Sequence, residues 1–230
     1  MSKDDTLPAH SKYGPSSAYR WLRCPASIPL TDRAYEIKPE LKDATTPQAE
    51  EGTRAHTLVE RALRKGCRVR DTVRIPEPGI ELLEGYVDYV RSLDGELHIE
   101  HRVDILPPLC YGTADAVVIG SDTVHIVDLK FGLNPVPAGG NVQLLSYAWG
   151  VYKTLVGLNR HPKFCLAIYQ PRRRTGGPPL DRWETNHDVV VGHGVYLERV
   201  IETTESGKVP SPKPGEHCMY CPALKITCGG

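Results

Sequence analysis

GTADAVVIGSDTVHIVDLKFG, residues 112–132, contains two apolar segments separated by Ser121-Asp122. The β-branched residues of both segments and the turn residues between them predict an antiparallel hairpin. A two-residue turn at this point places Asp115 directly opposite Asp128. Opposed β carbons lie about 4.5 to 5.5 Å apart, so the two carboxylates would repel each other unless a cation lies between them.

Both faces of this hairpin are mostly apolar. Side chains alternate along a strand, so Lys130 shares one face with Asp128 and Ile126, whereas Val127 and Leu129 lie on the other face. This pattern indicates a strand pair inside a sheet that is covered on both sides. The three charged side chains therefore belong to one end of a buried sheet, provided that the pairing does not shift by one residue.

The charged residues of the hairpin have two interpretations. In the first, Lys130 forms a buried salt bridge with one carboxylate, which leaves the second aspartate without a partner. In the second, Asp115 and Asp128 supply the oxygen ligands that Mg²⁺ or Mn²⁺ prefers, and Lys130 orients a water and stabilises developing negative charge. The second interpretation predicts metal-assisted hydrolysis of a phosphodiester bond.

The composition indicates a globular protein, because 40% of the 230 residues are hydrophobic and 24% are charged. The 28 Lys and Arg residues balance 28 Asp and Glu residues, so any site for a polyanion must be local. The first residues lack the apolar segment of a signal peptide, and no apolar run approaches the roughly 18 residues of a membrane span. We therefore expect a soluble, cytoplasmic protein with no membrane partner.

Helix signals lie on both sides of the hairpin. Thr46-Pro47, early acids, late bases and Gly66 predict a helix over about residues 47–65. Apolar residues at helical spacing from Ile80 to Leu93 predict a second helix. We expect further helices at 17–24, 141–157 and 194–205, strands at 97–105, 111–120, 123–132 and 163–170, and irregular chain at 28–47.

Four short motifs follow one another between residues 52 and 147. They are GTRAH with His56, GTAD ending at Asp115, the tripeptide Asp128-Leu129-Lys130, and Gln143 followed four residues later by Tyr147. Each motif alone is weak, but the four in order form a strong signal. Together they resemble the PD-(D/E)XK nuclease superfamily in its RecB-like exonuclease branch.

The resemblance implies an α/β fold with a restriction-endonuclease-like core, a central mixed β-sheet flanked by helices, over residues 46–206. It implies that one or two Mg²⁺ or Mn²⁺ ions are held by His56, Asp115, Asp128 and the backbone carbonyl of Leu129. Lys130 would be the catalytic lysine. Gln143 and Tyr147, which share one helical face, would lie beside Lys130 and belong to the catalytic residues.

Three neighbouring residues keep alternative interpretations. His56 taken alone is equally an ordinary core histidine. Glu60 follows it by one helical turn, and Glu100 lies on the preceding strand. Each of the two glutamates either supports the site from behind its ligands or is a solvated surface acid.

The cysteines are seven in number and unevenly placed, which favours reduced thiols and metal ligation over disulfides. Cys218, Cys221 and Cys228 follow the core in residues 207–230, and Cys24 in the extension 1–45 is the candidate fourth ligand. This arrangement resembles the 4Fe–4S clamp of AddB-type and CRISPR-associated RecB-like nucleases, which would join the chain ends. Zinc is the rival metal, with His217 as an alternative ligand, and free thiols in a loose tail are the third interpretation. The remaining cysteines are interpreted as isolated apolar residues: Cys67, Cys110 and Cys165.

Two segments are candidates for nucleic-acid contact. Arg172, Arg173 and Arg174 form the densest basic cluster, in a loop that contacts DNA or is simply solvated. Residues 19–23, YRWLR, offer rings and cations for a single strand beside Cys24, although Trp21 equally suits a core.

The expected activity is that of a divalent-metal-dependent DNA exonuclease in recombination or repair. The resemblance is to stand-alone nucleases of phages and mobile elements, which act in a bacterial cell or a phage-infected host. Its expected partners are linear duplex ends or single strands of DNA, and a recombination protein such as a single-strand annealing protein. Two alternatives stay open: a non-catalytic DNA-binding module on the same fold, and a zinc-stabilised interaction protein whose carboxylates only bridge to lysine.

Overall fold

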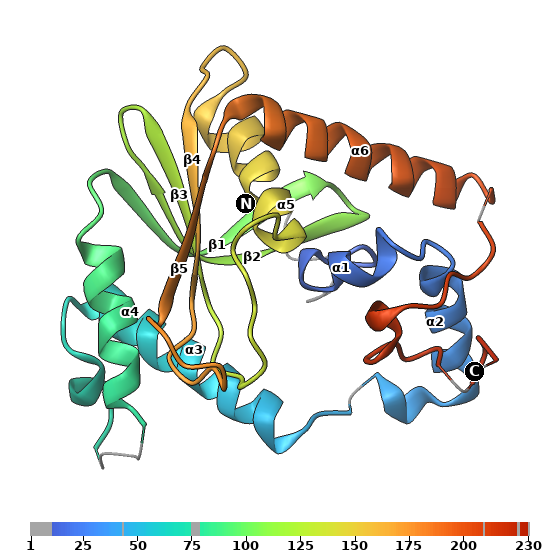
Figure 1. The fold of residues 1–230 in the computed structure, drawn as a ribbon, viewed down its shortest axis with the longest axis horizontal. Coiled ribbons are helices and arrows are strands. Elements are labelled where there is room, and N and C mark those ends of the chain that lie inside the picture. The colour runs from blue at the N-terminus through green and yellow to red at the C-terminus, as the bar shows by residue number, and fades with distance from the viewer. Residues whose placement is uncertain (1–10, 43, 75–78, 209, 225, 230) are drawn as a thin grey trace, which may run out of the picture.

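The quoted segment forms the two strands β2 (Cys110–Ile119) and β3 (Thr123–Leu129) of a five-stranded sheet with the order β1-β2-β3-β4-β5. β1 (Glu96–Leu106) pairs with β2, and β5 (Leu180–Thr185) with β4 (Lys163–Tyr169), in the antiparallel sense, while β4 is parallel to β3. This computed structural model describes residues 11–42, 44–74, 79–208, 210–224 and 226–229. The prediction of an α/β fold with a central mixed sheet flanked by helices is confirmed (Figure 1).

The hairpin has the predicted register. Ile119 pairs with Val124, and the ladder continues to the pair Ala116 and Val127. The two aspartates occupy the next facing positions, and there a side chain replaces the backbone bond, since the Leu129 N–H donates to Asp115 Oδ2 at 2.7 Å. The carboxylates therefore lie at the end of the ladder, where the strands no longer pair through their backbones.

Helices cover the two faces of the sheet as separate layers (Figure 1). α3 (Pro47–Lys65) and α4 (Glu81–Arg91) pack on one face around Val127 and Leu129. α5 (Val142–Val151) and α6 (His187–Glu205), with Trp21 from the N-terminal segment, pack on the other around Ile126. The interior position predicted for the hairpin follows from these two apolar layers.

Helix α3 begins and ends at the residues that its sequence signals predict. In α3 the Thr46 side chain accepts a hydrogen bond from the Ala49 N–H at 3.2 Å, and Pro47 is the first helical residue. Gly66 ends the helix in the left-handed region, at φ 66°. Because α3 is fixed at both ends, the position of His56 along it is fixed as well.

One α-helix, α2 (Ser27–Ile37), and one strand, β5, were not predicted. Residues 28–47 were expected to be irregular, yet α2 buries Ile28, Thr31 and Ala34 at helical spacing. Pro29 suggested irregular chain, but it lies in the first turn of α2, where its missing N–H costs the helix no hydrogen bond. The second is β5, one of the two edge strands, whose few apolar residues are half-buried and form too weak an alternation to predict a strand.

The other helices differ from expectation at their ends. α1 (Ala18–Trp21) is only four residues long. The predicted helix 141–157 consists of α5 and a π-helical turn, Tyr152–Val156. α6 begins at His187 rather than near residue 194, because Asn186 caps it by accepting from the Val189 N–H at 3.1 Å. None of the helices in the described ranges is long and apolar enough to cross a membrane.

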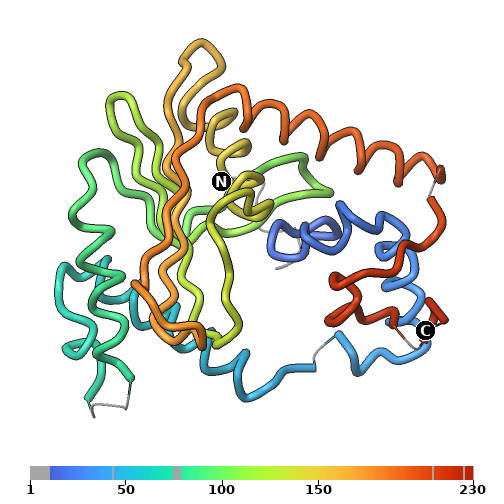
Figure 2. The backbone as a smooth tube through the Cα atoms, in the orientation of Figure 1, coloured from blue at the N-terminus to red at the C-terminus, as the bar shows by residue number. Residues whose placement is uncertain are grey.

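The N-terminal segment and the C-terminal segment lie side by side (Figure 2). The Thr227 hydroxyl donates to the Leu30 carbonyl at 2.7 Å, and the Lys213 N–H donates to Cys24 Sγ at 3.5 Å. These bonds join residues 189 or more positions apart in the sequence. The C-terminal segment therefore packs on α2 and its preceding turn.

Two glycines of α6 should respond in opposite directions to the same substitution. A Cβ on Gly194 would lie 2.2 Å from the Trp149 ring, whereas a Cβ on Gly192 would meet nothing within 4 Å. We expect Gly194→Ala to lower the free energy of unfolding by about 2 kcal/mol through overpacking. Gly192→Ala should raise it by about 0.5 to 1 kcal/mol through helix propensity. Urea unfolding of both variants measures the difference, and equal effects would contradict the close contact of α5 with α6.

Candidate functional site

The end of β3 carries a closed set of polar contacts with α5. Lys130 Nζ lies 2.8 Å from Asp128 Oδ2 and donates to Gln143 Oε1 at 3.0 Å. Gln143 Nε2 in turn donates to Asp128 Oδ1 at 2.8 Å. Asn141 caps α5 by accepting from the Gln143 N–H at 3.0 Å, which fixes the start of the helix. Gln143 therefore positions the lysine and the carboxylate relative to each other.

A second set of contacts surrounds Asp115. Its Oδ1 lies 3.2 Å from His56 Nδ1 of α3, while its Oδ2 accepts from the Leu129 N–H. One ligand atom each of His56, Glu100 and Asp115 lies within 4.8 Å of the others. These three residues come from α3, β1 and β2, and they could hold a metal ion together.

Glu100 reaches this set through an unusual backbone conformation. Its φ is 46°, in the left-handed region, where residues other than glycine, asparagine and aspartate rarely occur. The pairing of β1 with β2 passes from Ile99 opposite Ala116 to His101 opposite Ala114, with no backbone pair for Glu100 itself. Such local strain persists where the surrounding structure demands it, often at functional sites.

The electrostatics of the site show an excess of negative charge. Burial, and then the charge of Asp115, raise the pKa of Glu100 to about 7. Burial also raises the pKa of Asp128, although the charge of Lys130 opposes this effect. For His56, burial alone would lower the pKa, but the hydrogen bond and the charge of Asp115 outweigh it and raise the value. Three carboxylates thus share one lysine and one histidine.

The donor set fits a hard divalent cation. Asp128 Oδ2 is buried and lies 2.8 Å from the Lys130 ammonium, while Oδ1 accepts from Gln143. Carboxylate oxygens such as those of Asp115, Asp128 and Glu100 are the ligands that Mg²⁺ and Mn²⁺ prefer. A bound cation would also relieve the repulsion that raises the pKa of Glu100.

The two remaining predicted residues lie on different sides of this set. Tyr147 is buried on α5, one turn beyond Gln143, and burial followed by the charges of Asp128 and Asp115 raises the pKa of its hydroxyl. Leu129 is buried, and its N–H donates to Asp115.

The four predicted cysteine ligands line one pocket of about 430 Å³, although their sulfurs are not drawn together into a single-ion site. Cys24 lies beside α1, and the other three come from the C-terminal segment. Burial, and then the charges of Cys221, Cys24 and Cys218, raise the pKa of the Cys228 thiol. No three of these sulfurs, all within the described residues, lie within 4.8 Å of one another. His217 lines the same pocket and contacts the Lys213 carbonyl at 2.9 Å.

The predicted basic loop does not present three free cations. Arg172 pairs with Glu51 of α3 at 2.6 Å and lies over the Phe131 ring. Arg173 donates to the Pro178 carbonyl within its own loop. Arg174 is exposed. The loop therefore packs partly against α3 and is not a uniform basic surface.

Comparison with known proteins assigns the chain to a family. A family model described as "Protein of unknown function (DUF2800)" matches residues 10–229. The chain belongs to the DUF2800 family. Among solved structures, one described as "Crystal structure of SSO0001" is similar to this DUF2800 chain at 14% sequence identity and a TM-score of 0.46. The match covers 100% of the DUF2800 chain and 91% of that chain, and we draw no functional argument from it.

Sequence patterns left the role of Glu100 in the DUF2800 protein open. The sequence shows an acid on a strand, but nothing in it signals the left-handed backbone that turns this acid toward His56 and Asp115. Glu60, the other candidate, is half-buried and accepts from Arg64 at 2.9 Å within α3, and its charge contributes to the raised pKa of Glu100 only after burial, Asp115 and His56. The structure therefore separates the two glutamates that the sequence could not.

Replacing Glu100 with glutamine should change how stability depends on pH. A carboxyl whose folded pKa is raised to about 7 stabilises the fold while protonated, and this contribution is lost as the pH rises from its ordinary value of 4.5 through 7. At pH 8 without metal, we expect the variant to be more stable than the wild type by about 1 kcal/mol, allowing for partial exposure of the group. The difference should vanish near pH 4.

Urea unfolding at both pH values, in the presence of a chelator, measures this effect. Glu202→Gln is the matched control, because Glu202 is exposed on α6, which packs on the other face of the sheet from α3, and it should show no such gain at pH 8. Added Mg²⁺ should stabilise the wild type more than the Glu100 variant. A Glu100 variant that responds to pH and Mg²⁺ as the wild type does would exclude Glu100 from the site.

Proposed function

We propose that this DUF2800 protein is a divalent-metal-dependent nuclease that hydrolyses phosphodiester bonds in DNA. The observation that carries the proposal is the convergence of Asp115, Asp128 and His56 with one lysine at the end of a buried hairpin. A buried salt bridge alone would need one carboxylate for Lys130, and here two further carboxylates remain.

The order of the motifs supports the same proposal. His56, Asp115, Asp128-Leu129-Lys130 and Gln143 match the pattern of the PD-(D/E)XK superfamily in its RecB-like exonuclease branch. Their positions on α3, β2, β3 and α5 suit the helix, hairpin and helix of that core. We infer from this that the activity is exonucleolytic and serves recombination or repair.

Each side chain has a distinct part in the proposed reaction. His56, Glu100, Asp115 and Asp128 would hold Mg²⁺ or Mn²⁺, which supplies an acidified water and polarises the phosphate. The Lys130 ammonium lies beside Asp128, where it can orient the water and stabilise negative charge on the phosphate oxygens. Gln143 keeps Lys130 and Asp128 in place through its two hydrogen bonds.

We propose that Cys24, Cys218, Cys221 and Cys228 hold a 4Fe–4S cluster with a structural role. All four line one pocket between the chain ends. Zinc is the rival metal for the same four thiolates.

The experiment that tests the activity is a time course on end-labelled linear DNA and closed circular DNA. The protein is purified without oxygen and incubated with Mg²⁺, Mn²⁺ or a chelator, as wild type and as Lys130→Ala. We expect the wild type to shorten linear DNA only with a divalent metal. Absence of metal-dependent cleavage by the wild type would favour a non-catalytic DNA-binding module on the same fold.

A further inference from the structure

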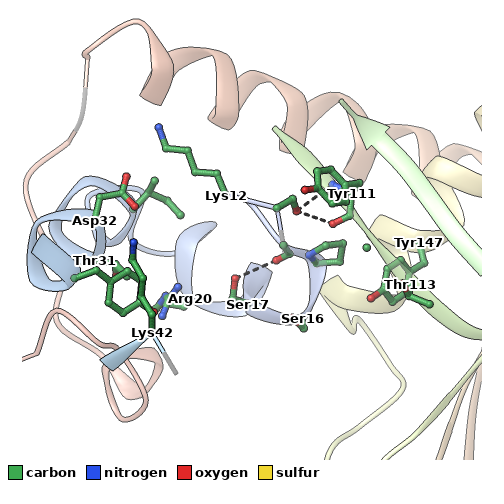
Figure 3. Close-up of a pocket in the computed structure, with 16 residues that line it drawn as sticks. Lys12, Ser16, Ser17, Arg20, Thr31, Asp32, Lys42, Tyr111, Thr113 and Tyr147 are labelled. Atoms are coloured by element: carbon green, nitrogen blue, oxygen red, sulfur yellow. Dashed lines mark hydrogen bonds between the residues drawn. The ribbon is translucent and has the colours of Figure 1, made fainter. Parts of the chain in front are cut away.

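A hollow of about 870 Å³ lies between the N-terminal segment, the start of β2 and α5 (Figure 3). Arg20 and Lys42 lie toward one end, and Tyr111, Thr113 and Tyr147 toward the other. Ser16 and Ser17 lie between the two ends. The hollow therefore has a direction, from a cationic end toward β2 and α5.

The β2 end of the hollow adjoins the candidate site. Tyr147 lies one helical turn beyond Gln143, which bonds both Asp128 and Lys130. Thr113 lies two residues before Asp115 on β2. A ligand that fills the hollow therefore ends beside the groups assigned to hydrolysis.

Backbone packing keeps this junction narrow. A Cβ on Gly112 would lie 3.1 Å from both the Pro15 ring and the Tyr147 side chain. The N-terminal segment is also held here by Ser11, whose hydroxyl donates to the Tyr111 carbonyl at 2.6 Å. The wall formed by the N-terminal segment is thus fixed against β2 and α5.

The hollow is locally cationic in a protein with zero formal net charge. Lys12, Arg20 and Lys42 line it, against one acid, Asp32. Lys12 is engaged by Glu205 at 2.6 Å. Arg20 Nε is buried and has no hydrogen-bond partner among the residues that the structure describes. Arg20 and Lys42 therefore offer donors to an anion inside the hollow.

The other lining groups suit phosphates better than bases. Ser16 and Thr113 are exposed and carry hydroxyl donors. Tyr111 and Tyr147 are almost fully buried, at 3% and 4% exposure, so neither ring offers a free face for stacking. Tyr35 is the half-buried ring, with Lys42 Nζ 5.7 Å from its centroid. Cations and hydroxyls are the groups that bind a nucleic-acid backbone without reading its sequence.

We propose that this hollow binds one unpaired strand of nucleic acid and leads its phosphates past Lys42 and Arg20 to the candidate site. The inference rests on the proposed function and adds its substrate class: single strands, or duplex ends that have opened locally. A volume of about 870 Å³ lies within the range of ligand pockets, about 300 to 1,000 Å³, and suits a short stretch of one strand better than a duplex.

Binding can be tested without turnover, in the presence of a chelator. The probe is a fluorescein-labelled oligonucleotide of about 20 residues, offered as a single strand and as the matching blunt duplex, with fluorescence anisotropy as the readout. We expect the wild type to bind the single strand at least about tenfold more tightly, because only an unpaired strand gives the protein its phosphates inside the hollow.

Two variants remove one phosphate contact each. Arg20→Gln and Lys42→Gln should each weaken single-strand binding about three- to tenfold and lower the salt slope of log K by about 0.7. Arg70→Gln, which removes an exposed cation far from the hollow, is the matched control and should change neither quantity. Lys42 is exposed, so its variant reports on binding even if Arg20→Gln lowers stability.

Failure of this inference differs from failure of the proposed function. Equal binding of strand and duplex, or variants that match Arg70→Gln, would overturn the hollow as the strand site, even if Lys130-dependent cleavage is present. Single-strand binding that depends on Arg20 and Lys42 would support the hollow even if no metal produces cleavage.

Discussion

Lys130→Ala should slow metal-dependent cleavage of linear DNA by roughly 10³-fold, within the range lost when a group that stabilises transition-state charge is removed. The physical reason is the position of the ammonium, 2.8 Å from Asp128 Oδ2 and 3.0 Å from Gln143 Oε1, at the centre of the carboxylate set. Single-turnover rates with protein in excess measure the chemical step.

A control must separate this loss from loss of folding. Lys153 is a second partly buried lysine with a carboxylate partner, 2.5 Å from Glu198, in the π-helical turn that follows α5. Lys153→Ala breaks a comparable ion pair and should lower stability while retaining cleavage at low temperature. Equal cleavage rates for wild type and Lys130→Ala would refute the role assigned to Lys130.

Cys218→Ser and Cys221→Ser should abolish the metal bound by the cysteine pocket. We expect each variant to lose its iron and to unfold at least about 10 °C lower, since a chain of this length loses about 2 to 4 °C for each kcal/mol. The reason is that Cys24 and the three C-terminal cysteines line one pocket between the two chain ends, so the bound metal would join those ends. Elemental analysis and thermal unfolding measure the two effects.

The matched control for the cysteine variants is Cys67→Ser. Cys67 is free, lies just after α3 and does not line the cysteine pocket, so its replacement should leave metal content unchanged. A wild-type protein purified without oxygen that holds neither iron nor zinc would contradict the cluster. One equivalent of zinc and no iron would replace the cluster with the rival metal.

The parts of the fold that sequence could predict are those with local signals. Thr46-Pro47 and Gly66 gave the ends of α3, and Ser121-Asp122 gave the register of the hairpin. Because the register was correct, the neighbourhood of Asp115 and Asp128 followed from it. Gln143 could be assigned to one helical face, but its two hydrogen bonds to Lys130 and Asp128 required coordinates.

The parts that could not be predicted depend on tertiary contacts. The left-handed backbone of Glu100 has no sequence pattern, since a strand residue takes this conformation only when its neighbours compensate for the strain. The arginine loop was a charge pattern, and its ion pair with Glu51 depends on where α3 passes. Pro29 suggested irregular chain, although its place in the first turn of α2 is permitted.

Arg20 lines both the cysteine pocket and the hollow beside β2. The Arg20 side chain therefore lies between the pocket of the proposed cluster and the proposed path of the nucleic-acid strand. Oxidation of the proposed cluster should therefore weaken strand binding through Arg20, with the carboxylates of the candidate site unchanged. Strand binding and cleavage would then be lost independently: oxidation would weaken binding, and loss of the divalent ion would stop cleavage.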